Sequence, residues 1–351
     1  MDFAIALPTP ADSWKVVRRA EELGFSSAWF YDTQLLCADV FVGMAAAAVQ
    51  TTRIRLGTGV IIPSNRIAPV VANALASLNQ LAPGRIDFGI GTGFTGRRTM
   101  GLQAIKLADM AEYIRIVRGL LAEDTVSWCF EQKERKIRFL NPELGLINTN
   151  DMIPLHVSAL GPKSRRLTAE LGGNWINFYM DANSAVESLK DMKAAYREIG
   201  RDTKDMYSTV FALGCVLAEG ESADSPRAKE QAGPFLGAYL HGALENGISP
   251  DQMPPDLQDA LASLREAYEN YEPEDARYLT LHRGHLMFLR PEEVPLLTDE
   301  MIRRRTITGT NREVREQIGR LQDAGYDQIA VQIVPGHEAA LEDWADVAEG
   351  L

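Results

Sequence analysis

The chain has 351 residues, 46% of them hydrophobic and 24% charged, which suits one large globular domain or two ordinary ones. Its net charge of −12, without a basic block, argues against nucleic acid as a partner. No stretch approaches the roughly 20 apolar residues that cross a bilayer, and the N-terminus MDFAIALPTP lacks the basic region and cleavage site of a signal peptide, so we expect a cytoplasmic protein without a membrane segment.

Strand and helix patterns alternate along the first third of the chain. Each strand candidate is a short apolar run, and each helix candidate has apolar residues at helical spacing. The first helix has Asp12 or Ser13 as a candidate N-cap and Gly24 as its stop. The expected strands span 3–7, 27–32, 54–60 and 85–91, and the expected helices span 10–25, 38–52, 68–84 and 106–123.

The alternation resumes after a small surface hairpin. The runs VSWCFE (126–131) and KIRFLN (136–141) predict that hairpin. Eight strand runs in βα order, joined by right-handed crossovers, predict an α/β protein folded as a (β/α)8 TIM barrel. The later strands are expected at 154–160, 174–180, 208–219 and 327–334, and the later helices at 161–172, 184–200 and 311–325.

The segment 221–306 interrupts this pattern between the seventh and eighth strands. It is mostly helical and polar, and it is far longer than an ordinary loop. We interpret it as a helical insertion within a single domain, 1–351, and as a lid over the barrel mouth. A dimerisation element is the alternative interpretation.

The strand ends contain two glycine-bearing motifs. The run GIGTG (89–93) has two open interpretations, a tight turn that needs positive φ or a close approach to a ligand. The turn Gly161-Pro162-Lys163-Ser164 opens a helix, where free amide donors beside a lysine suit a phosphate. Arg165 and Arg166 follow and either assist the phosphate or are merely solvated.

Several isolated polar residues have two interpretations each. Asp32 at a strand end is a candidate for binding a cofactor or substrate, or caps a local turn. His282 and His285 form the pattern HRGH, but without an evident third ligand we assign no metal site and expect a solvated helix face or a lid histidine that donates a proton or contacts substrate. His156 is expected in the core. Cys37 is expected as a small hydrophobe, and the three cysteines have no CxxC spacing.

Three stretches carry a family resemblance that spans nearly the whole chain and is weakest in 221–306. They are IRLGTGVIIPSNRIAPVVANALASLNQLAPGRIDFGIGTG (54–93), HVSALGPKSRRLTAELGGNWI (156–176) and TGTNREVREQIGRLQDAGYDQIAVQ (308–332), together with EELGFSSAWFYD at the end of the first helix. They resemble the luciferase-like flavin-dependent oxidoreductases, the family of bacterial luciferase and of the deazaflavin-dependent methylenetetrahydromethanopterin reductases.

The resemblance implies a (β/α)8 barrel that binds coenzyme F-420, a deazaflavin, or reduced FMN. The turn at residues 158–163 is more similar to that of the deazaflavin branch than to that of the FMN monooxygenases. FMN also carries a phosphate, however, which the same backbone amides could bind. In the family a non-prolyl cis peptide backs the cofactor ring, and the matching bond is Gly59–Val60. The residues expected to contact the cofactor are Asp32, Thr58, Gly59, Val60, Thr92, Gly93, Ser158, Ala159, Leu160, Gly161, Pro162 and Lys163, to which our own interpretation of the turn adds Ser164.

The chain departs from its family at two positions. Thr33 stands where several members have a histidine, and Phe94 stands where the sugar-phosphate dehydrogenases have a glutamate, so an alcohol oxidation that needs a strong base there is disfavoured. We expect Thr33, Phe94, Thr95 and Arg283 to contact a bulky, fairly apolar organic substrate, and Asp32, His282 and His285 to be the catalytic candidates.

Three functions compete at this point. The first is F-420-dependent hydride transfer to or from an organic substrate. The second is an FMNH2-dependent two-component monooxygenase served by a separate flavin reductase, and the third is a non-catalytic flavin-binding barrel. In the first two the cofactor does the hard chemistry and the protein orients it and excludes water. A homodimer is implied by the resemblance alone.

Overall fold

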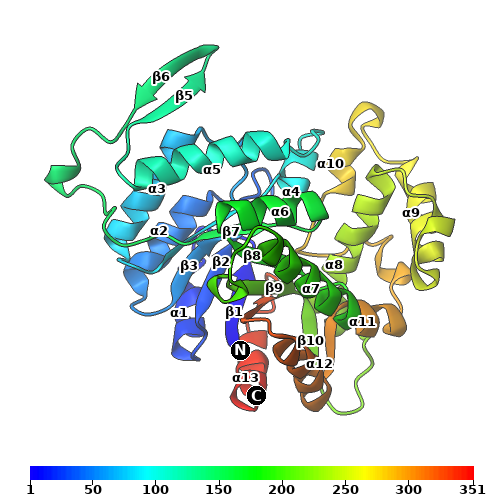
Figure 1. The fold of residues 1–351 in the computed structure, drawn as a ribbon. Helices are drawn as coiled ribbons and strands as arrows, with labels where there is room; N and C mark the ends of the chain where they lie inside the picture. The colour runs from blue at the N-terminus through cyan, green and yellow to red at the C-terminus, as the bar shows by residue number, and fades with distance from the viewer.

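The computed structural model describes residues 1–351 and contains a closed barrel of eight parallel strands (Figure 1). β1 closes the barrel by pairing with both β12 and β2. The predicted (β/α)8 barrel is therefore confirmed. In chain order the barrel strands are β1 (Asp2–Leu7), β2 (Ser27–Phe30), β3 (Arg55–Thr58), β4 (Ile86–Ile90), β7 (Leu155–Ser158), β8 (Asn174–Phe178), β9 (Ser208–Ala212) and β12 (Gln328–Gln332).

Helices surround the barrel, and most of them are amphipathic and bury an apolar side against it. α12 illustrates how local sequence sets the boundaries, because Thr310 and Glu313 form a capping box at its start and Gly325 ends it with φ of 94°. A cluster of 57 buried residues joins strands and helices into the main core. The surrounding helices are α1 (Trp14–Glu22), α2 (Val40–Gln50), α3 (Ala68–Leu81), α4 (Phe94–Arg98), α5 (Leu107–Leu121), α6 (Pro162–Leu171), α7 (Ala182–Glu198), α12 (Asn311–Ala324) and α13 (Ala340–Glu349).

Aromatic rings and a histidine fill the barrel interior. Trp29 donates from Nε1 to Gln328 Oε1 at 2.9 Å, and its ring lies 5.0 Å from that of His156. A Cβ on Gly57 would lie 2.4 Å from the Trp29 ring, so the strand needs glycine there. His156 is 3% exposed, which confirms its expected place in the core.

The apolar run 208–219 is not one strand, as the sequence predicted, but two. β9 ends at Ala212, and β10 (Gly214–Leu217) leaves the barrel to pair in parallel with β11 (Ile307–Thr310). A Cβ on Gly214 would lie 2.0 Å from the Ile307 carbonyl oxygen, so only glycine allows this close pairing. Apolar residues continue through the bend because both strands are buried.

The hairpin forms, but its second strand was predicted at the wrong position. β5 (Val126–Phe130) pairs with β6 (Lys133–Ile137) in antiparallel fashion. The turn consists of Glu131 and Gln132, whose φ values of 51° and 61° are those of a two-residue hairpin turn. This tight turn starts the return strand three residues before the predicted KIRFLN. The hairpin projects from the barrel in Figure 1.

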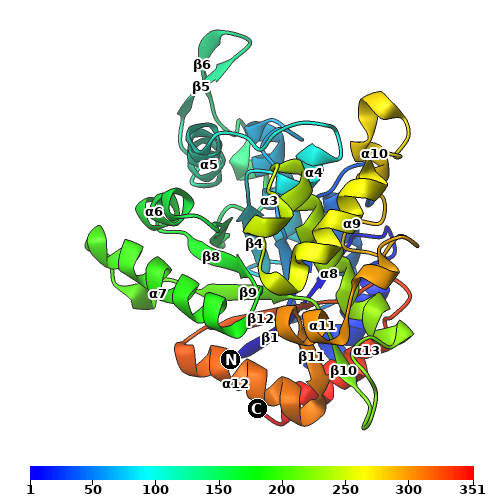
Figure 2. The same cartoon turned by 90° about the vertical axis from the view of Figure 1, so that its right-hand side faces the viewer.

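A group of helices lies to one side of the barrel, between β9 and β12 in the chain (Figures 1 and 2). It has its own apolar cluster of 18 buried residues. No helix in the structure has the length and apolar character needed to span a membrane. The helices of this group are α8 (Pro226–Glu245), α9 (Gln258–Tyr268), α10 (Tyr278–Leu281) and α11 (Asp299–Arg305). The 3-10 helices of the chain are η1 (Pro142–Leu144), η2 (Thr203–Asp205), η3 (Pro250–Gln252), η4 (Pro255–Leu257), η5 (Glu274–Ala276) and η6 (Val294–Leu296).

Candidate functional site

The carboxyl ends of β2, β3, β4 and β7, with the residues that follow them, form what we call the barrel mouth. These strands are consecutive neighbours in the barrel. A Cβ on Gly91 would lie 2.8 Å from Val60 Cγ2 and 3.4 Å from Ser158 Cβ, so the ends of three strands lie close together and leave no room for a side chain at Gly91. The structure thus brings together the residues that the sequence placed at strand ends, where barrel enzymes have their active sites.

The end of β3 has the backbone geometry that the family resemblance implied. The Gly59–Val60 peptide bond is cis. Thr58 is buried, and its hydroxyl both donates to the Gly89 carbonyl at 2.8 Å and accepts from the Gly89 amide at 2.9 Å. Because its hydroxyl proton is used within the barrel, the Thr58 side chain has no free donor to offer a ligand.

The glycines of 89–93 serve the backbone. A Cβ on Gly89 would lie 1.9 Å from the Thr58 carbonyl oxygen, which excludes any other residue. Gly93 has φ of 86° and precedes α4. Gly89 is therefore explained by the close packing of β3 against β4, and Gly93 by a left-handed turn. Of the two interpretations of GIGTG, the tight turn that needs positive φ thus accounts for Gly93.

The turn between β7 and α6 exposes backbone donors. The first backbone bond of the helix runs from the Arg165 amide to the Gly161 carbonyl at 3.0 Å, so the amides of Lys163 and Ser164 have no intrahelical acceptor. Ser164 Oγ accepts from the Gly161 amide at 3.2 Å and fixes the turn. A Cβ on Gly161 would meet no atom within 4 Å, so the space beside the turn is open. These features suit a phosphate.

The two arginines after this turn are occupied elsewhere. Arg165 is 8% exposed and donates to Asp191 at 2.9 Å and to Ser188 at 3.0 Å. Arg166 is exposed and pairs with Glu170 at 3.0 Å. Of the three cations that the sequence places at this turn, Lys163 alone is exposed without an ion pair, and it remains available to an anion.

Asp32 is held by the loop that follows β3. It is 4% exposed and accepts from Arg66 Nη1 at 2.9 and 3.0 Å, and from Asn65 at 3.3 Å. Burial acts to lower the pKa of Arg66, but the carboxylates of Asp32 and Asp39 outweigh it and raise this pKa above its usual value. The sequence analysis missed Arg66, although a buried carboxylate requires a partner of this kind.

The loop after Asp32 makes local contacts. Thr33 Oγ1 donates to Cys37 Sγ at 3.2 Å, and both side chains are half-buried. Burial raises the pKa of the Cys37 thiol, which therefore stays protonated at neutral pH. Cys37, which the sequence predicted as a small hydrophobe, is thus a half-buried thiol held by Thr33.

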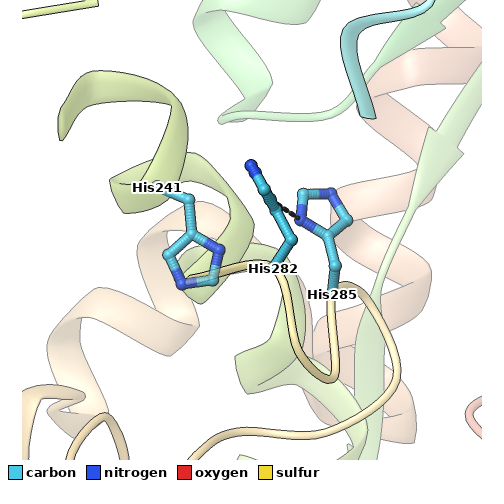
Figure 3. Close-up of side chains that lie close together, drawn as sticks. All are labelled: His241, His282 and His285. Atoms are coloured by element: carbon cyan, nitrogen blue, oxygen red, sulfur yellow. Dashed lines mark hydrogen bonds between the residues drawn. The ribbon is translucent and has the colours of Figure 1, made fainter. Parts of the chain in front are cut away.

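For His282 and His285 the sequence left open a solvated helix face or a lid histidine. The solvated face is wrong, because both side chains are buried with a third histidine, His241 of α8 (Figure 3). His282 follows the short helix α10, and His285 lies in the turn after it. Their Nδ1 atoms are 3.3 Å apart. The signal for His241 was weak, because it stands 41 residues before His282 and within the mostly apolar stretch GPFLGAYLHGAL of α8.

The outer nitrogen of each ring contacts a polar group. His282 Nε2 lies 2.8 Å from Glu245, His285 Nε2 lies 3.1 Å from Thr95 Oγ1, and His241 Nε2 bonds to Glu293. Burial first, and then the neighbouring histidines and Arg98, hold the pKa of His285 well below its usual value, so this ring is neutral at neutral pH.

The polar groups around the histidines connect α8 to α4. Arg98 of α4 bonds to Glu245 and, at 2.8 Å, to Asn246. The Arg98 guanidinium lies 4.2 Å from the centre of the Phe94 ring, which is 46% exposed. Arg283, in contrast, is exposed and makes no side-chain hydrogen bond or ion pair.

The turn that contains His285 covers part of the barrel mouth. The Leu286 carbonyl accepts from Gln332 Nε2, and Gln332 Oε1 accepts from Tyr31 at 2.8 Å. The Leu286 side chain packs with Val60 and Phe178 against the aromatic cluster of the barrel interior. The segment between β9 and β12 therefore packs, through Leu286, against the same interior cluster as Val60, which follows the cis bond.

Comparison with known proteins agrees with this geometry. A family model described as luciferase-like monooxygenase matches residues 5–328. The 5,10-methylenetetrahydromethanopterin reductase of Methanolobus tindarius is 27% identical over 330 residues, which cover 92% of this chain and 91% of that protein. The F-420-dependent hydroxymycolic acid dehydrogenase of Mycobacterium tuberculosis is 32% identical over 222 residues, 58% of this chain and 60% of that protein. The solved structure of the coenzyme F-420-dependent tetrahydromethanopterin reductase of Methanopyrus kandleri superimposes with a TM-score of 0.71 at 19% identity, covering 98% of this chain and 97% of that one.

Proposed function

Because the chain belongs to the luciferase-like monooxygenase family of oxidoreductases, we propose that it transfers a hydride between coenzyme F-420 and an organic substrate. The observation that carries the proposal is the turn after β7, where two free amides and Lys163 border an open space beside Gly161. The similarity to an F-420-dependent dehydrogenase supports the choice of cofactor.

The residues of the barrel mouth fit this cofactor. The amides of Lys163 and Ser164, with the Lys163 ammonium, would hold the phosphate. Val60, at the cis bond, would back the ring. When bound, the deazaflavin supplies the hydride donor or acceptor, and the protein supplies position and exclusion of water.

The remaining candidates act on this centre from different distances. Asp32 is a positioning residue, because it holds Arg66 and the loop after β3 through its ion pair. His285 positions Thr95 through the bond to its hydroxyl. Thr33, Phe94, Thr95 and Arg283 are proposed to contact the substrate, whose apolar part would lie against Phe94 and Leu286. His282 bonds to His285 and Glu245, so it lies one hydrogen bond further from Thr95 than His285 does.

An FMNH2-dependent monooxygenase with a separate reductase is the second candidate. The description of the family model favours it, and the same turn could bind the phosphate of FMN. A non-catalytic barrel would not need the covered mouth described above.

Titration of the purified protein with F-420 and with FMN, followed by cofactor fluorescence, tests the proposal. We expect F-420 to bind at least about tenfold more tightly than FMN, a difference of about 1.4 kcal/mol. Gly161→Leu should weaken F-420 binding at least about tenfold, because its side chain fills the open space that the phosphate needs.

Gly319→Leu is the matched control, because a Cβ on Gly319 of α12 also meets no atom within 4 Å and should leave the affinity unchanged. Preferential binding of FMN would favour the monooxygenase. Binding of neither cofactor would contradict both enzyme proposals.

A further inference from the structure

The side chains of His241, His282 and His285 form one buried cluster that the proposed hydride transfer does not require. We propose that this cluster binds a divalent transition metal ion, with Zn²⁺ as the reference ion. The three rings come from α8 and from the turn after α10, and their candidate ligand atoms all lie within 4.8 Å of one another. Figure 3 shows the rings grouped together between these two segments.

The hydrogen bonds to groups around the cluster all engage Nε2 atoms, so the Nδ1 atoms have no partner outside the cluster. Glu293 and Glu245 accept at Nε2 of His241 and His282, so these rings carry their protons on Nε2 and direct the lone pair of Nδ1 away from the carboxylates. His241 Nδ1 is buried and has no hydrogen-bond partner. An unpaired buried nitrogen is costly unless something binds it.

The pair of His282 and His285 raises the same problem. Their Nδ1 atoms lie 3.3 Å apart, and the Nε2 atoms lie near Glu245 and Thr95. If both rings carry the proton on Nε2, two lone pairs face each other across that distance. A cation between them removes the repulsion.

The spacing matches a metal site. Two nitrogen ligands at about 2.0–2.1 Å from a tetrahedral Zn²⁺ are roughly 3.3–3.4 Å apart. The His282–His285 separation of 3.3 Å already has this value. The candidate ligand atom of His241 lies within 4.8 Å of the other two, so this side chain would have to move closer to complete a three-histidine set.

The groups outside the rings resemble the outer shell of metal sites, in which each ligating histidine donates its second nitrogen to a carboxylate or another acceptor. Glu293, Glu245 and Thr95 occupy these positions. Arg290 pairs with Glu293, and Arg98 pairs with Glu245, so the two carboxylates are already neutralised. A divalent ion would bring two uncompensated charges, which favours an anionic fourth ligand such as hydroxide or a substrate oxygen.

The number and kind of the side chains suit a transition metal ion. Three histidines with an open fourth position are typical of catalytic zinc sites. Thr95 and Leu286 connect this position to the barrel mouth.

Metal analysis of the full chain tests the proposal without any cofactor, so its outcome does not depend on the F-420 assignment. The protein is stripped with a chelator and titrated with Zn²⁺ by calorimetry, and Co²⁺ is used as a visible spectroscopic probe. We expect one ion per chain, a higher melting temperature with metal, and the absorption of a four- or five-coordinate Co²⁺ site.

Variants locate the site. His241→Asn should weaken Zn²⁺ binding at least about 100-fold, and Glu245→Gln about 10- to 100-fold. His337→Asn is the matched control, because His337 lies outside the cluster and pairs with Glu230 at 3.3 Å. If His241→Asn does not fold, His285→Asn and the wild-type titration decide. Absence of stoichiometric Zn²⁺ binding by the wild type, or unchanged binding in the folded variants, would overturn the proposal in favour of histidines that share a proton.

Discussion

At the scale of single residues, two buried aspartates of the barrel are each paired with an arginine. Asp32 binds Arg66 at the mouth, whereas Asp87 lies inside the barrel and accepts two bonds of 2.8 Å from Arg55. His156 Nε2 also lies 3.3 Å from Asp87. A buried carboxylate needs such partners because desolvation penalises its charge. These two pairs thus stabilise the ionised acids that the fold encloses.

The pairing of Asp87 predicts how stability depends on pH. Burial acts to raise the pKa of Asp87, but the contacts with His156 and Arg55 outweigh it and hold this pKa below its usual value. As the pH falls below about 5, the unfolded chain takes up the proton before the folded chain does, so stability present near neutral pH is lost progressively. We expect the free energy of unfolding to fall less steeply with acidification in Asp87→Asn than in the wild type.

Urea unfolding measured between pH 7 and pH 3 checks this prediction. Asp323→Asn, at an exposed position of α12, is the control and should follow the wild-type curve. Identical slopes for wild type and Asp87→Asn would mean that other acids determine the acid sensitivity.

At the scale of elements, the turn 282–286 joins the helices beside the barrel to its mouth. Its histidines bond to α8 and to Thr95, and its Leu286 packs against the barrel-interior cluster that Val60 also contacts. Both ends of this connection are fixed by buried contacts. We therefore propose that the segment 221–306 acts as a lid through this turn.

Replacement of Leu286 tests the lid. Its φ of 60° is unusual for a residue with a side chain, so Leu286→Gly removes the cover without straining the backbone. We expect iodide to quench the fluorescence of bound F-420 more efficiently in this variant, because water and ions reach the mouth. Glu123→Gly, another residue with φ of 61°, is the backbone-matched control. Equal quenching in all three proteins would contradict a covering role for Leu286.

At the scale of the whole molecule, α2 and α3 have exposed apolar residues. The α2 sequence VFVGMAAAAVQ has no charged residue, yet Val42 and Val49 are 57% and 61% exposed. Val70 of the neighbouring α3 is 49% exposed. A helix that is apolar on all sides is normally buried, so we expect a second copy of the chain to cover this face.

Sedimentation analysis should therefore find a particle of about twice the chain mass of 38.8 kDa. The double variant Val42→Lys and Val49→Lys should sediment as a monomer, because two buried charges at an interface are costly. Leu279→Lys in α10 is the control for the alternative that 221–306 forms the interface. Dissociation by Leu279→Lys, but not by the α2 variant, would place the interface there.

Features that depend on neighbouring residues could be predicted from the sequence. Apolar periodicity and turn residues were sufficient to locate the eight strands and seven helices around the barrel, although α4 and α13 were missed, and the run PLHVSALGPKS located a helix start with free amides. The tertiary structure alone decided the contacts between distant residues. Arg66 forms an ion pair with Asp32, β10 leaves the barrel at Gly214 to pair with β11, and His241 lies next to His282 and His285. In each case the packing of helices and strands in the folded chain determines which residues become partners. Such long-range contacts leave no periodic pattern in the sequence.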